Sequence, residues 1–234
     1  MKHPELARYS TNHLDPALVA GERNCVQEEA EQLYGFQLFT PEFCEKLIAD
    51  AESTPEDWET ELSMDFYEPR FDAGEDQQAV PLSEKSRLSR ENEKVPAAND
   101  DDDTMKTCFS LRKRPGLYEV YREVIEKFVA PIAHEKWPTF HMSMIRTPYI
   151  LKYDADDPNT YTSMGVHWDQ NPCTMVVYLN KGFEGGGTYF PRWKFSSGHP
   201  TPGKALLYPG TLSHEHAGLA IKKGKRYILN CDMF

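Results

Sequence analysis

The stretch "GVHWDQNPCTMVVYLN", Gly165 to Asn180, joins a polar turn to an apolar run rich in β-branched residues. Such side chains pack well on a pleated sheet, so "CTMVVYLN" (173–180) predicts a buried strand. In an extended chain, side chains two residues apart share a face, so His167 and Asp169 can face one ion while Trp168 points away. A single His-x-Asp pair is common by chance, and the surrounding sequence has to decide whether it forms a site.

Similar apolar segments recur from residue 140 to the C-terminus, separated by clusters of Asp, Asn, Pro and Gly. This pattern is typical of antiparallel sheets and favours a sandwich or barrel. There is no alternation of strand and helix, no GxGxxG motif and no P-loop, so a nucleotide-binding fold is set aside. Strands are predicted in "FHMSMIR" (140–146), "YILKY" (149–153), "CTMVVYLN" (173–180), "GTYF" (187–190), "KALLYP" (204–209) and "RYILNCDMF" (226–234).

Two segments before residue 140 have helical periodicity. In "LFTPEFCEKLIADAES" (38–53), Thr40 suits an N-cap and Pro41 the first helical position. In "PGLYEVYREVIEKFVAPI" (115–132), apolar residues recur every three or four positions, which predicts a long amphipathic helix packed on a flat surface. The expected fold class is therefore mainly β with buttressing helices.

A chain of 234 residues predicts one core. Residues 1–32 are polar without a sustained period, so we expect an N-terminal extension before a domain that spans 33–234. The net charge is −11, and residues 51–103 hold 17 acidic and 5 basic residues, a net of −12. We expect an acidic flexible insert at about 51–106, either a solvated loop or, alternatively, a flap that attracts a cationic substrate.

Composition also excludes several classes of partner. Nothing resembles a basic stripe, so we expect no nucleic-acid partner. No apolar run approaches the ~18–20 residues of a membrane span, and the N-terminus lacks the apolar core of a signal peptide. We therefore expect a cytoplasmic protein that does not enter membranes. The five cysteines are odd in number and form no CxxC pair, which predicts buried free thiols.

The segment "YPGTLSHEHAGLAIKKGKRYILN" (208–230) adds what the His-x-Asp pair lacks. Either His214 or His216 could supply a second imidazole, and two imidazoles with one carboxylate make the facial triad that suits Fe(II) and leaves coordination positions open. The absence of Cys from this set argues against a structural zinc site. A 2-oxo acid that chelates such a metal leaves its far carboxylate to be held. Arg226 could bind it through two hydrogen bonds, and the Tyr178 hydroxyl could add another.

At this point the residues resemble the Fe(II)/2-oxoglutarate-dependent dioxygenases of the prolyl 4-hydroxylase superfamily, in particular the C-terminal catalytic domain of procollagen lysyl hydroxylases. "FEGGGTYFPRW" (183–193) is similar to the "YEGGG" turn of that family and the strand after it. "LLYPGTLSHEHAGLAIKKGKRYI" (206–228) is similar to the family's "HPGRLTHYHEGLP…GTRYI". The likeness covers roughly residues 33–234. It implies a double-stranded β-helix, the jelly-roll fold that cupins share.

Carried over by position, the resemblance implies roles for individual residues. The implied iron ligands are His167, Asp169 and His216, with His214 as the competing distal ligand. His216 is preferred because Arg226 follows it by ten residues, as in the family. The implied binders of 2-oxoglutarate are Arg226 and Tyr178. Four aromatic residues could wall a substrate channel, although a core role is equally open for each: Trp168, Tyr149, Tyr189 and Trp193.

The resemblance also implies the reaction. With Fe(II), 2-oxoglutarate, O2 and ascorbate as reductant, an amino-acid side chain of a peptide or protein would be hydroxylated, with release of succinate and CO2. Peptidyl lysine is the first expectation, since an acidic segment favours a cation; peptidyl proline and then a free amino acid or small metabolite follow. The rivals are a cupin-type metalloenzyme that does not use 2-oxoglutarate, and a non-catalytic binding module. A homodimer is an open expectation, because dimers are common among relatives.

Overall fold

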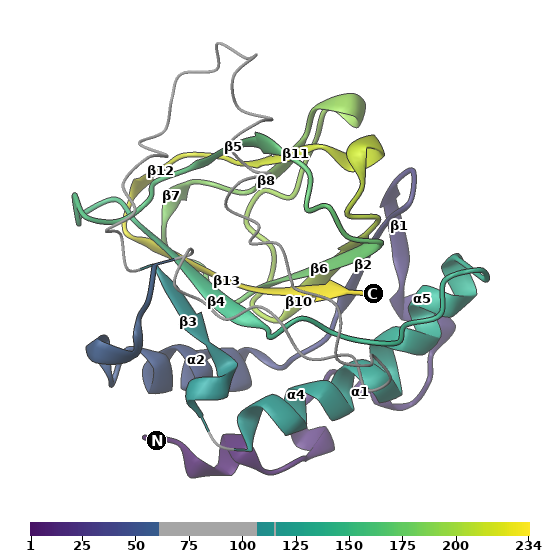
Figure 1. Ribbon diagram of the computed structural model, residues 1–234, viewed down its shortest axis with the longest axis horizontal. Coiled ribbons are helices and arrows are strands. Elements are labelled where there is room, and N and C mark those ends of the chain that lie inside the picture. The colour runs from purple at the N-terminus through teal and green to yellow at the C-terminus, as the bar shows by residue number, and fades with distance from the viewer. Residues whose placement is uncertain (61–106, 115) are drawn as a thin grey trace, which may run out of the picture.

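Two antiparallel sheets face each other in the computed structural model, which describes residues 1–60, 107–114 and 116–234 (Figure 1). The larger sheet has the order β1-β2-β10-β6-β13-β4-β3, and the smaller has the order β5-β11-β8-β9. Strands of the larger sheet are β1 (Gln27–Ala30), β2 (Leu33–Gln37), β3 (Cys108–Ser110), β4 (Tyr149–Asp154), β6 (Cys173–Tyr178), β10 (Lys204–Tyr208) and β13 (Lys225–Met233). Strands of the smaller sheet are β5 (Met164–His167), β8 (Thr188–Phe190), β9 (Phe195–Ser196) and β11 (His216–Gly218), beside the short pair β7 (Glu184–Gly185) and β12 (Ile221–Lys223).

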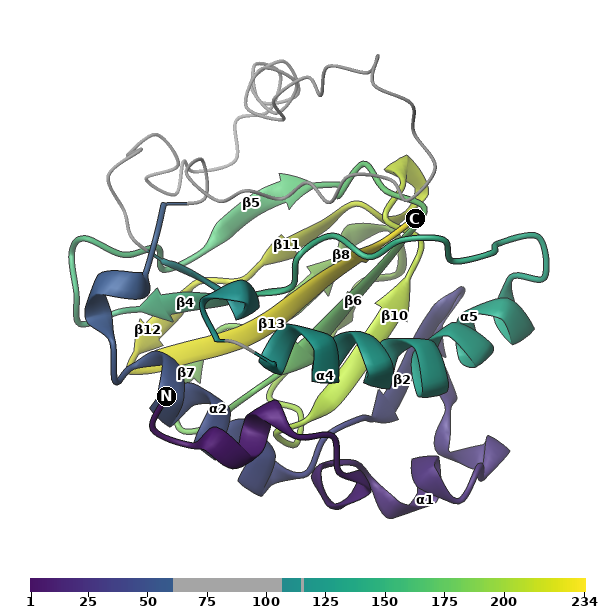
Figure 2. The same cartoon turned by 60° about the horizontal axis from the view of Figure 1, so that its bottom comes forward.

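Helices cover the outer face of the larger sheet, as the two ribbon views show (Figures 1 and 2). They are α1 (Pro16–Val19), α2 (Pro41–Ala51), α4 (Leu117–Val124) and α5 (Ala130–Lys136), and a π-helical stretch at Ile125–Val129 joins the last two. Short 3₁₀ turns lie at Pro4–Ala7, Thr11–His13, Arg23–Cys25, Pro55–Asp57, Leu111–Lys113, Pro191–Trp193 and Leu212–His214. The expectation of a mainly β fold with buttressing helices is confirmed.

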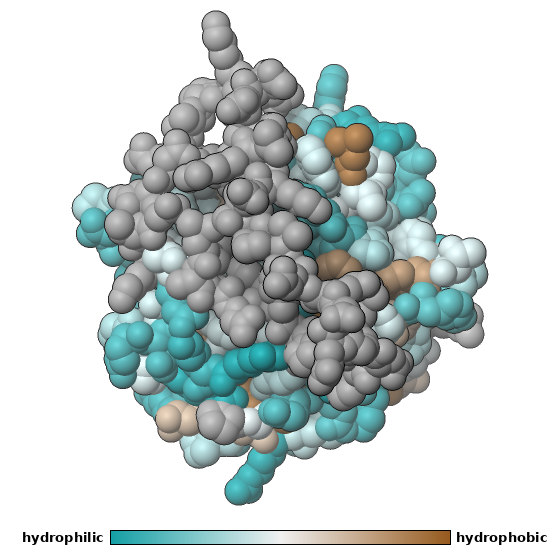
Figure 3. Space-filling model, in the orientation of Figure 1, coloured by the Kyte–Doolittle hydropathy of each residue, from teal (hydrophilic) through white to brown (hydrophobic). Residues whose placement is uncertain are grey.

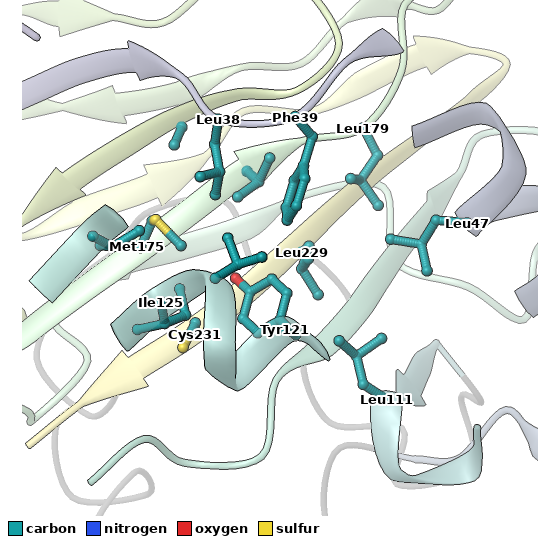
Figure 4. Packing of buried hydrophobic residues seen from close by; sticks show 14 of the residues in the cluster. Leu38, Phe39, Leu47, Leu111, Tyr121, Ile125, Met175, Leu179, Leu229 and Cys231 are labelled. Atoms are coloured by element: carbon teal, nitrogen blue, oxygen red, sulfur yellow. The ribbon is translucent and has the colours of Figure 1, made fainter. Parts of the chain in front are cut away.

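Strand β6 has almost no alternation of polar and apolar residues, because this strand is buried on both faces. Met175 packs with Tyr121 of α4 and Leu229 of β13 in the cluster beneath the helices (Figure 4). Val176 and Tyr178 belong to the second cluster, which fills the space between the two sheets. A strand with core on either side needs apolar residues at every position, so alternation disappears.

Local signals explain where the helices begin. The hydroxyl of Thr40 accepts a hydrogen bond from the Phe43 amide at 3.3 Å, and Pro41 opens α2. These two predictions are confirmed. The long helix expected at 115–132 begins at Leu117 and ends at Lys136, with the π-helical stretch in its middle.

Residues 1–32, expected to form an extension, pack against the domain. Leu6 and Leu14 are 0% and 1% exposed within the main core, and Asp50 of α2 accepts hydrogen bonds from the amides of Lys2 and His3. Strand β1 pairs with β2. Single apolar residues inside short polar turns show no periodicity, which is why the pattern gave no sign of this packing.

Two further expectations differ from the structure or fall outside it. The strand predicted at 140–146 is wrong: its only pairing is a bridge from Ile145 to Met233, because Ser143 and Arg146 bond irregularly to the C-terminal residues. Of the acidic insert expected at about 51–106, residues 61–106 lie outside the described residues. The part that is described is packed, with Trp58 3% exposed.

On the face that Figure 3 shows, the described residues that can be seen are mainly hydrophilic, with small separate hydrophobic areas. Among the described residues, no helix has the length and apolar character needed to cross a membrane.

Candidate active site

Three metal-ligating side chains meet where β5 and β11 pair. His167 ends β5, His216 begins β11, and the two residues lie directly opposite each other in register. Asp169 follows β5 by two residues, and the Oδ1 atom of its carboxylate lies 3.6 Å from the Nε2 atom of each histidine. One ligand atom from each residue falls within 4.8 Å of the others. Two imidazoles and one carboxylate at this spacing could hold a divalent metal as a facial triad.

Hydrogen bonds behind the histidines set their tautomers. His167 donates from Nδ1 to the Gly165 carbonyl at 2.8 Å, and His216 donates from Nδ1 to the His214 carbonyl at 3.1 Å. With the proton on Nδ1, the lone pair of each Nε2 faces Asp169. This outer shell of bonds is what a metal-binding histidine requires.

The surroundings of the Asp169 carboxylate favour its ionised form. Burial raises its pKa, but the electrostatic interactions with His216 and His167, the His167 hydrogen bond and the Thr174 hydroxyl outweigh burial and lower the pKa to about 2. The Thr174 hydroxyl lies 2.7 Å from Oδ2, which leaves Oδ1 for an ion. Thr174 faces this way because it shares the inner face of β6 with Val176 and Tyr178.

His216 is prepared to remain neutral. Burial, with the nearby His167, lowers its pKa to about 4 although Asp169 acts in the opposite direction. The Tyr208 hydroxyl lies 3.2 Å from Nε2 of His216, so it hydrogen-bonds the lone pair that a metal ion would take. Sequence reasoning did not find Tyr208, since nothing in "KALLYP" distinguishes it from a core tyrosine.

His214 has a different position from His216. It ends a 3₁₀ turn and not a strand, and its ring nitrogens contact the Ser213 hydroxyl at 2.9 Å and the Glu31 carbonyl at 3.3 Å. Its ring packs 4.7 Å from that of Trp193. Neither nitrogen of His214 belongs to the triad.

A cavity of about 210 Å³ opens from the triad between the two sheets. It runs along β13, whose inward-facing residues at positions 226, 228, 230 and 232 all line it. Thr188, Met164 and Gly218 close the side formed by the smaller sheet.

At one end of this cavity lies a cationic side chain without a counter-ion among the described residues. Arg226 is 1% exposed, and its Nη2 donates to the Thr188 hydroxyl at 3.2 Å. Its Nε and Nη1 have no hydrogen-bond partner in the described residues, nor does the buried Tyr178 hydroxyl. A buried guanidinium with unmade hydrogen bonds costs stability unless an anion completes the site. The far carboxylate of 2-oxoglutarate would match the Arg226 donors in charge and in number.

The surroundings hold Arg226 in place. The guanidinium lies over the ring of Tyr153, 5.0 Å from its centroid. A Cβ on Gly186 would crowd Phe183 and Ile221, at 2.9 and 3.0 Å, and would touch the Arg226 Cδ at 3.4 Å. Gly186 has φ +73°, so a side chain there would also strain the backbone. Glycine at position 186 thus allows Phe183, Ile221 and Arg226 to pack closely around the turn.

Of the four aromatic residues expected in a substrate channel, the structure places two at the cavity. Tyr149 and Trp168 line it. Tyr189 and Trp193 are not among the lining residues, and the Trp193 indole contacts the Glu31 carboxylate at 3.4 Å on the side of His214.

A polar group on the cavity wall was not expected from the sequence. Arg146 and Asp232 form an ion pair at 2.7 Å, and Asn230 bonds both to Asp232 and to the Tyr149 hydroxyl. The only indication of this polar group in the sequence lies in "RYILNCDMF", where the polar residues at positions 230 and 232 share a strand face with Arg226.

No family model matches the chain. It is 27% identical over 208 residues to the multifunctional procollagen lysine hydroxylase and glycosyltransferase LH3 of Rattus norvegicus, covering 87% of this chain and 24% of that protein. It is 24% identical over 222 residues to the procollagen-lysine,2-oxoglutarate 5-dioxygenase of Drosophila melanogaster, covering 93% of this chain and 26% of that protein. The chain thus spans about a quarter of the length of these curated relatives.

Among solved structures, the viral collagen prolyl hydroxylase vCPH from Paramecium Bursaria Chlorella virus-1, in its 2OG complex, superposes with a TM-score of 0.53. The sequences are 17% identical, and the match covers 88% of this chain and 96% of that chain. At this identity the match informs on the fold alone. The expected double-stranded β-helix is confirmed.

Proposed function

We propose that this chain, a homologue of the procollagen-lysine 2-oxoglutarate 5-dioxygenases, is an Fe(II)- and 2-oxoglutarate-dependent dioxygenase that hydroxylates a lysine side chain in a peptide or protein. One observation carries the proposal. A facial triad and a buried arginine that has no counter-ion among the described residues line the same cavity. Neither feature alone would indicate this class, because many metal sites lack an anion anchor.

The residues fit the absent groups by their chemistry. His167, Asp169 and His216 would hold iron, and Arg226 with Tyr178 would hold the C5 carboxylate of 2-oxoglutarate. When bound, the iron and 2-oxoglutarate supply oxidative decarboxylation. One oxygen atom of O2 enters succinate, the other replaces a substrate C–H bond with C–OH, and CO2 leaves.

The protein's own part is binding, orientation and exclusion of water. Thr174 fixes the carboxylate of Asp169, and the carbonyls of Gly165 and His214 fix the two imidazoles. Arg226 sets the direction of the co-substrate along the cavity, since its guanidinium is held by Thr188. Groups that are already oriented need no rearrangement when the reaction begins.

Arg226 also separates this proposal from a cupin-type metalloenzyme that uses no 2-oxoglutarate. Such an enzyme has no need of a buried arginine with unmade hydrogen bonds, which is costly to maintain. A non-catalytic module would need neither the anchor nor the two oriented histidines. A prolyl hydroxylase remains the alternative substrate assignment, since the superposed viral enzyme carries that description.

The direct test measures succinate formed from 2-oxoglutarate with Fe(II) and ascorbate, alone and with lysine- or proline-containing peptides. We expect succinate above the enzyme-free control, and more of it with a lysine peptide, whose mass rises by one oxygen atom. If no succinate forms and 2-oxoglutarate does not raise Tm, the dioxygenase proposal fails. If only proline peptides gain oxygen, the substrate assignment moves to the alternative.

Arg226→Ala should weaken 2-oxoglutarate binding on the order of 100-fold, because a buried charge-assisted pair is lost. Binding of Mn(II), used in place of iron, should change less than about threefold, because Arg226 touches none of the triad. Titration calorimetry measures both. Arg192→Ala, at a side chain that is 57% exposed, is the matched control. Equal loss of both ligands in Arg226→Ala would mean that Arg226 is structural.

Three further assignments belong to the same proposal. The five cysteines are free thiols, which supports a reducing compartment such as the cytoplasm. Omission of ascorbate from the assay tests it as the reductant. Light scattering after gel filtration tests a homodimer.

A further inference from the structure

One row of side chains crosses the inner face of the larger sheet beside the triad. Thr174 pairs in register with Tyr208 on one side and with Asp232 on the other. Thr174 bonds to Asp169 at 2.7 Å, and Tyr208 bonds to His216 at 3.2 Å. Paired residues have Cα atoms roughly 4.5–5.5 Å apart. Asp232 therefore lies next to the metal ligands.

Asp232 is also at the opposite end of β13 from the proposed co-substrate anchor. Six residues separate it from Arg226, which at ~3.3 Å per residue is roughly 20 Å of strand. Both side chains line the same cavity, with Ile228 and Asn230 between them. If 2-oxoglutarate occupies the part of the cavity near Arg226, the part near Asp232 remains available for the substrate side chain.

Asp232, Asn230, Arg146 and Tyr149 form one wall of the cavity, and this wall offers several hydrogen-bond acceptors. Arg146 donates from Nη1 to Oδ2 of Asp232 at 2.7 Å. The Asn230 amide nitrogen donates to Oδ1 of Asp232 at 3.3 Å and to the Tyr149 hydroxyl at 3.2 Å. Both amide hydrogens of Asn230 are then used, which leaves its carbonyl oxygen as the acceptor for a further donor. A carboxylate itself offers about four lone-pair sites.

An ammonium group matches this wall better than the alternatives. It carries three donors and no acceptor, and aromatic rings such as those of Tyr149 and Trp168, which also line the cavity, attract cations. An anion would meet the Asp232 charge, and Arg146 is already paired with that charge. A proline ring would cover polar groups without bonding to them, which is unfavourable.

We propose that Asp232, supported by Arg146 and Asn230, is the specificity-determining residue that binds the ammonium group of the substrate side chain beside the metal. The inference rests on the proposed function and deepens it. An ammonium group held at Asp232 leaves the neighbouring methylene groups of the side chain facing His167, Asp169 and His216. Lysine is then selected over neutral side chains of the same length by the charge at position 232.

The test is a binding measurement that needs no turnover. The protein is loaded with Mn(II) and N-oxalylglycine, an unreactive analogue of 2-oxoglutarate, and titrated with fluorescent peptides that carry lysine or its neutral analogue norleucine. Wild-type protein should bind the lysine peptide at least tenfold more tightly. Asp232→Asn should remove this preference while the affinity for N-oxalylglycine stays within about threefold. Glu184→Gln, at a carboxylate that is 69% exposed, should behave as wild type.

A second variant covers the case in which Asp232→Asn disturbs the fold by leaving Arg146 without its partner. The double variant Asp232→Asn with Arg146→Gln removes both charges of the ion pair, so the net charge of the wall is the same as in the wild type. It should also bind both peptides equally. A lysine preference that persists in a folded variant, or equal binding of the two peptides by wild type, overturns the inference. In those cases succinate formation by the wild type still supports the dioxygenase. Absence of both succinate formation and 2-oxoglutarate binding would instead overturn the proposed function and this inference with it.

Discussion

His214 and His216 stand two residues apart, yet only His216 lies in the triad. The local secondary structure explains the difference, because His214 ends a 3₁₀ turn, whereas His216 begins strand β11, which pairs with β5. The carbonyl of His214 then becomes the acceptor that orients the His216 ring. The two histidines have different tasks, because one contributes its side chain to the site and the other contributes its backbone.

His216→Ala should therefore weaken Mn(II) binding on the order of 100-fold or more, since one of three ligands is lost. His214→Ala keeps the backbone carbonyl and should change the affinity by less than about fivefold. Competition with a fluorescent chelator measures both affinities. Greater loss in His214→Ala than in His216→Ala would exchange their assignments.

At the scale of elements, the first 32 residues are part of the domain's packing. Leu14 is 1% exposed and pairs through its backbone with Phe39, and Lys2 and His3 bond to α2. Strand β1 extends the larger sheet by one strand. The segment thus supports the outer face of the sheet whose inner face carries Arg226 and Asp232.

Leu14→Ala should lower the free energy of unfolding by about 2–5 kcal/mol, the usual cost of such a cavity in a core. Val19→Ala, in the same segment but 38% exposed, should cost less than about 1 kcal/mol. Urea denaturation followed by circular dichroism measures the difference. Equal small effects would show that residues 1–32 are an appendage after all.

At the scale of the whole molecule, a buried ion network links four separate parts of the chain. Arg114 donates to Asp50 at 2.5 Å and to Asp57 at 2.7 Å, and Asp50 also accepts from the amides of Lys2 and His3. Burial raises the pKa of Asp50, but the His3 amide, Arg114 and the Lys2 amide outweigh burial and lower it. Asp50 and Arg114 together thus connect the N-terminus, α2, the turn after it and the segment before α4.

The lowered pKa of Asp50 makes stability depend on pH in a defined direction. Above the usual Asp value near 3.8 the contribution is complete, and it is lost as the pH falls through the still lower folded value. Asp50→Asn should cost about 3 kcal/mol at pH 7, with a gap to wild type that narrows below about pH 4. Thermal unfolding from pH 7 to 2.5 measures it, and Glu184→Gln is the exposed control. A constant gap would mean that the charge of Asp50 is not what matters.

Several features of this protein could be predicted from the sequence alone. Thr40 and Pro41 mark a helix start, and the apolar run 173–178 marks a central strand. The spacing of His167, Asp169, His216 and Arg226 predicts a metal triad with an anion anchor, and the structure brings these four residues to one cavity. Each of these signals depends on the residue itself or on neighbours along the chain, so a periodic or spaced pattern preserves it.

Other features were decided only by tertiary structure. The pairing of β5 with β11 chose His216 over His214, and the register of β13 with β6 brought Asp232 beside Thr174. Tyr208 reaches His216 from the neighbouring sheet, and Arg146 reaches the cavity from the segment before β4. Strand register is set by side-chain packing across the sheets and not by local preference. For that reason the sequence determined which metal-ligating and anion-binding side chains are present, and the fold decided which side chains surround them.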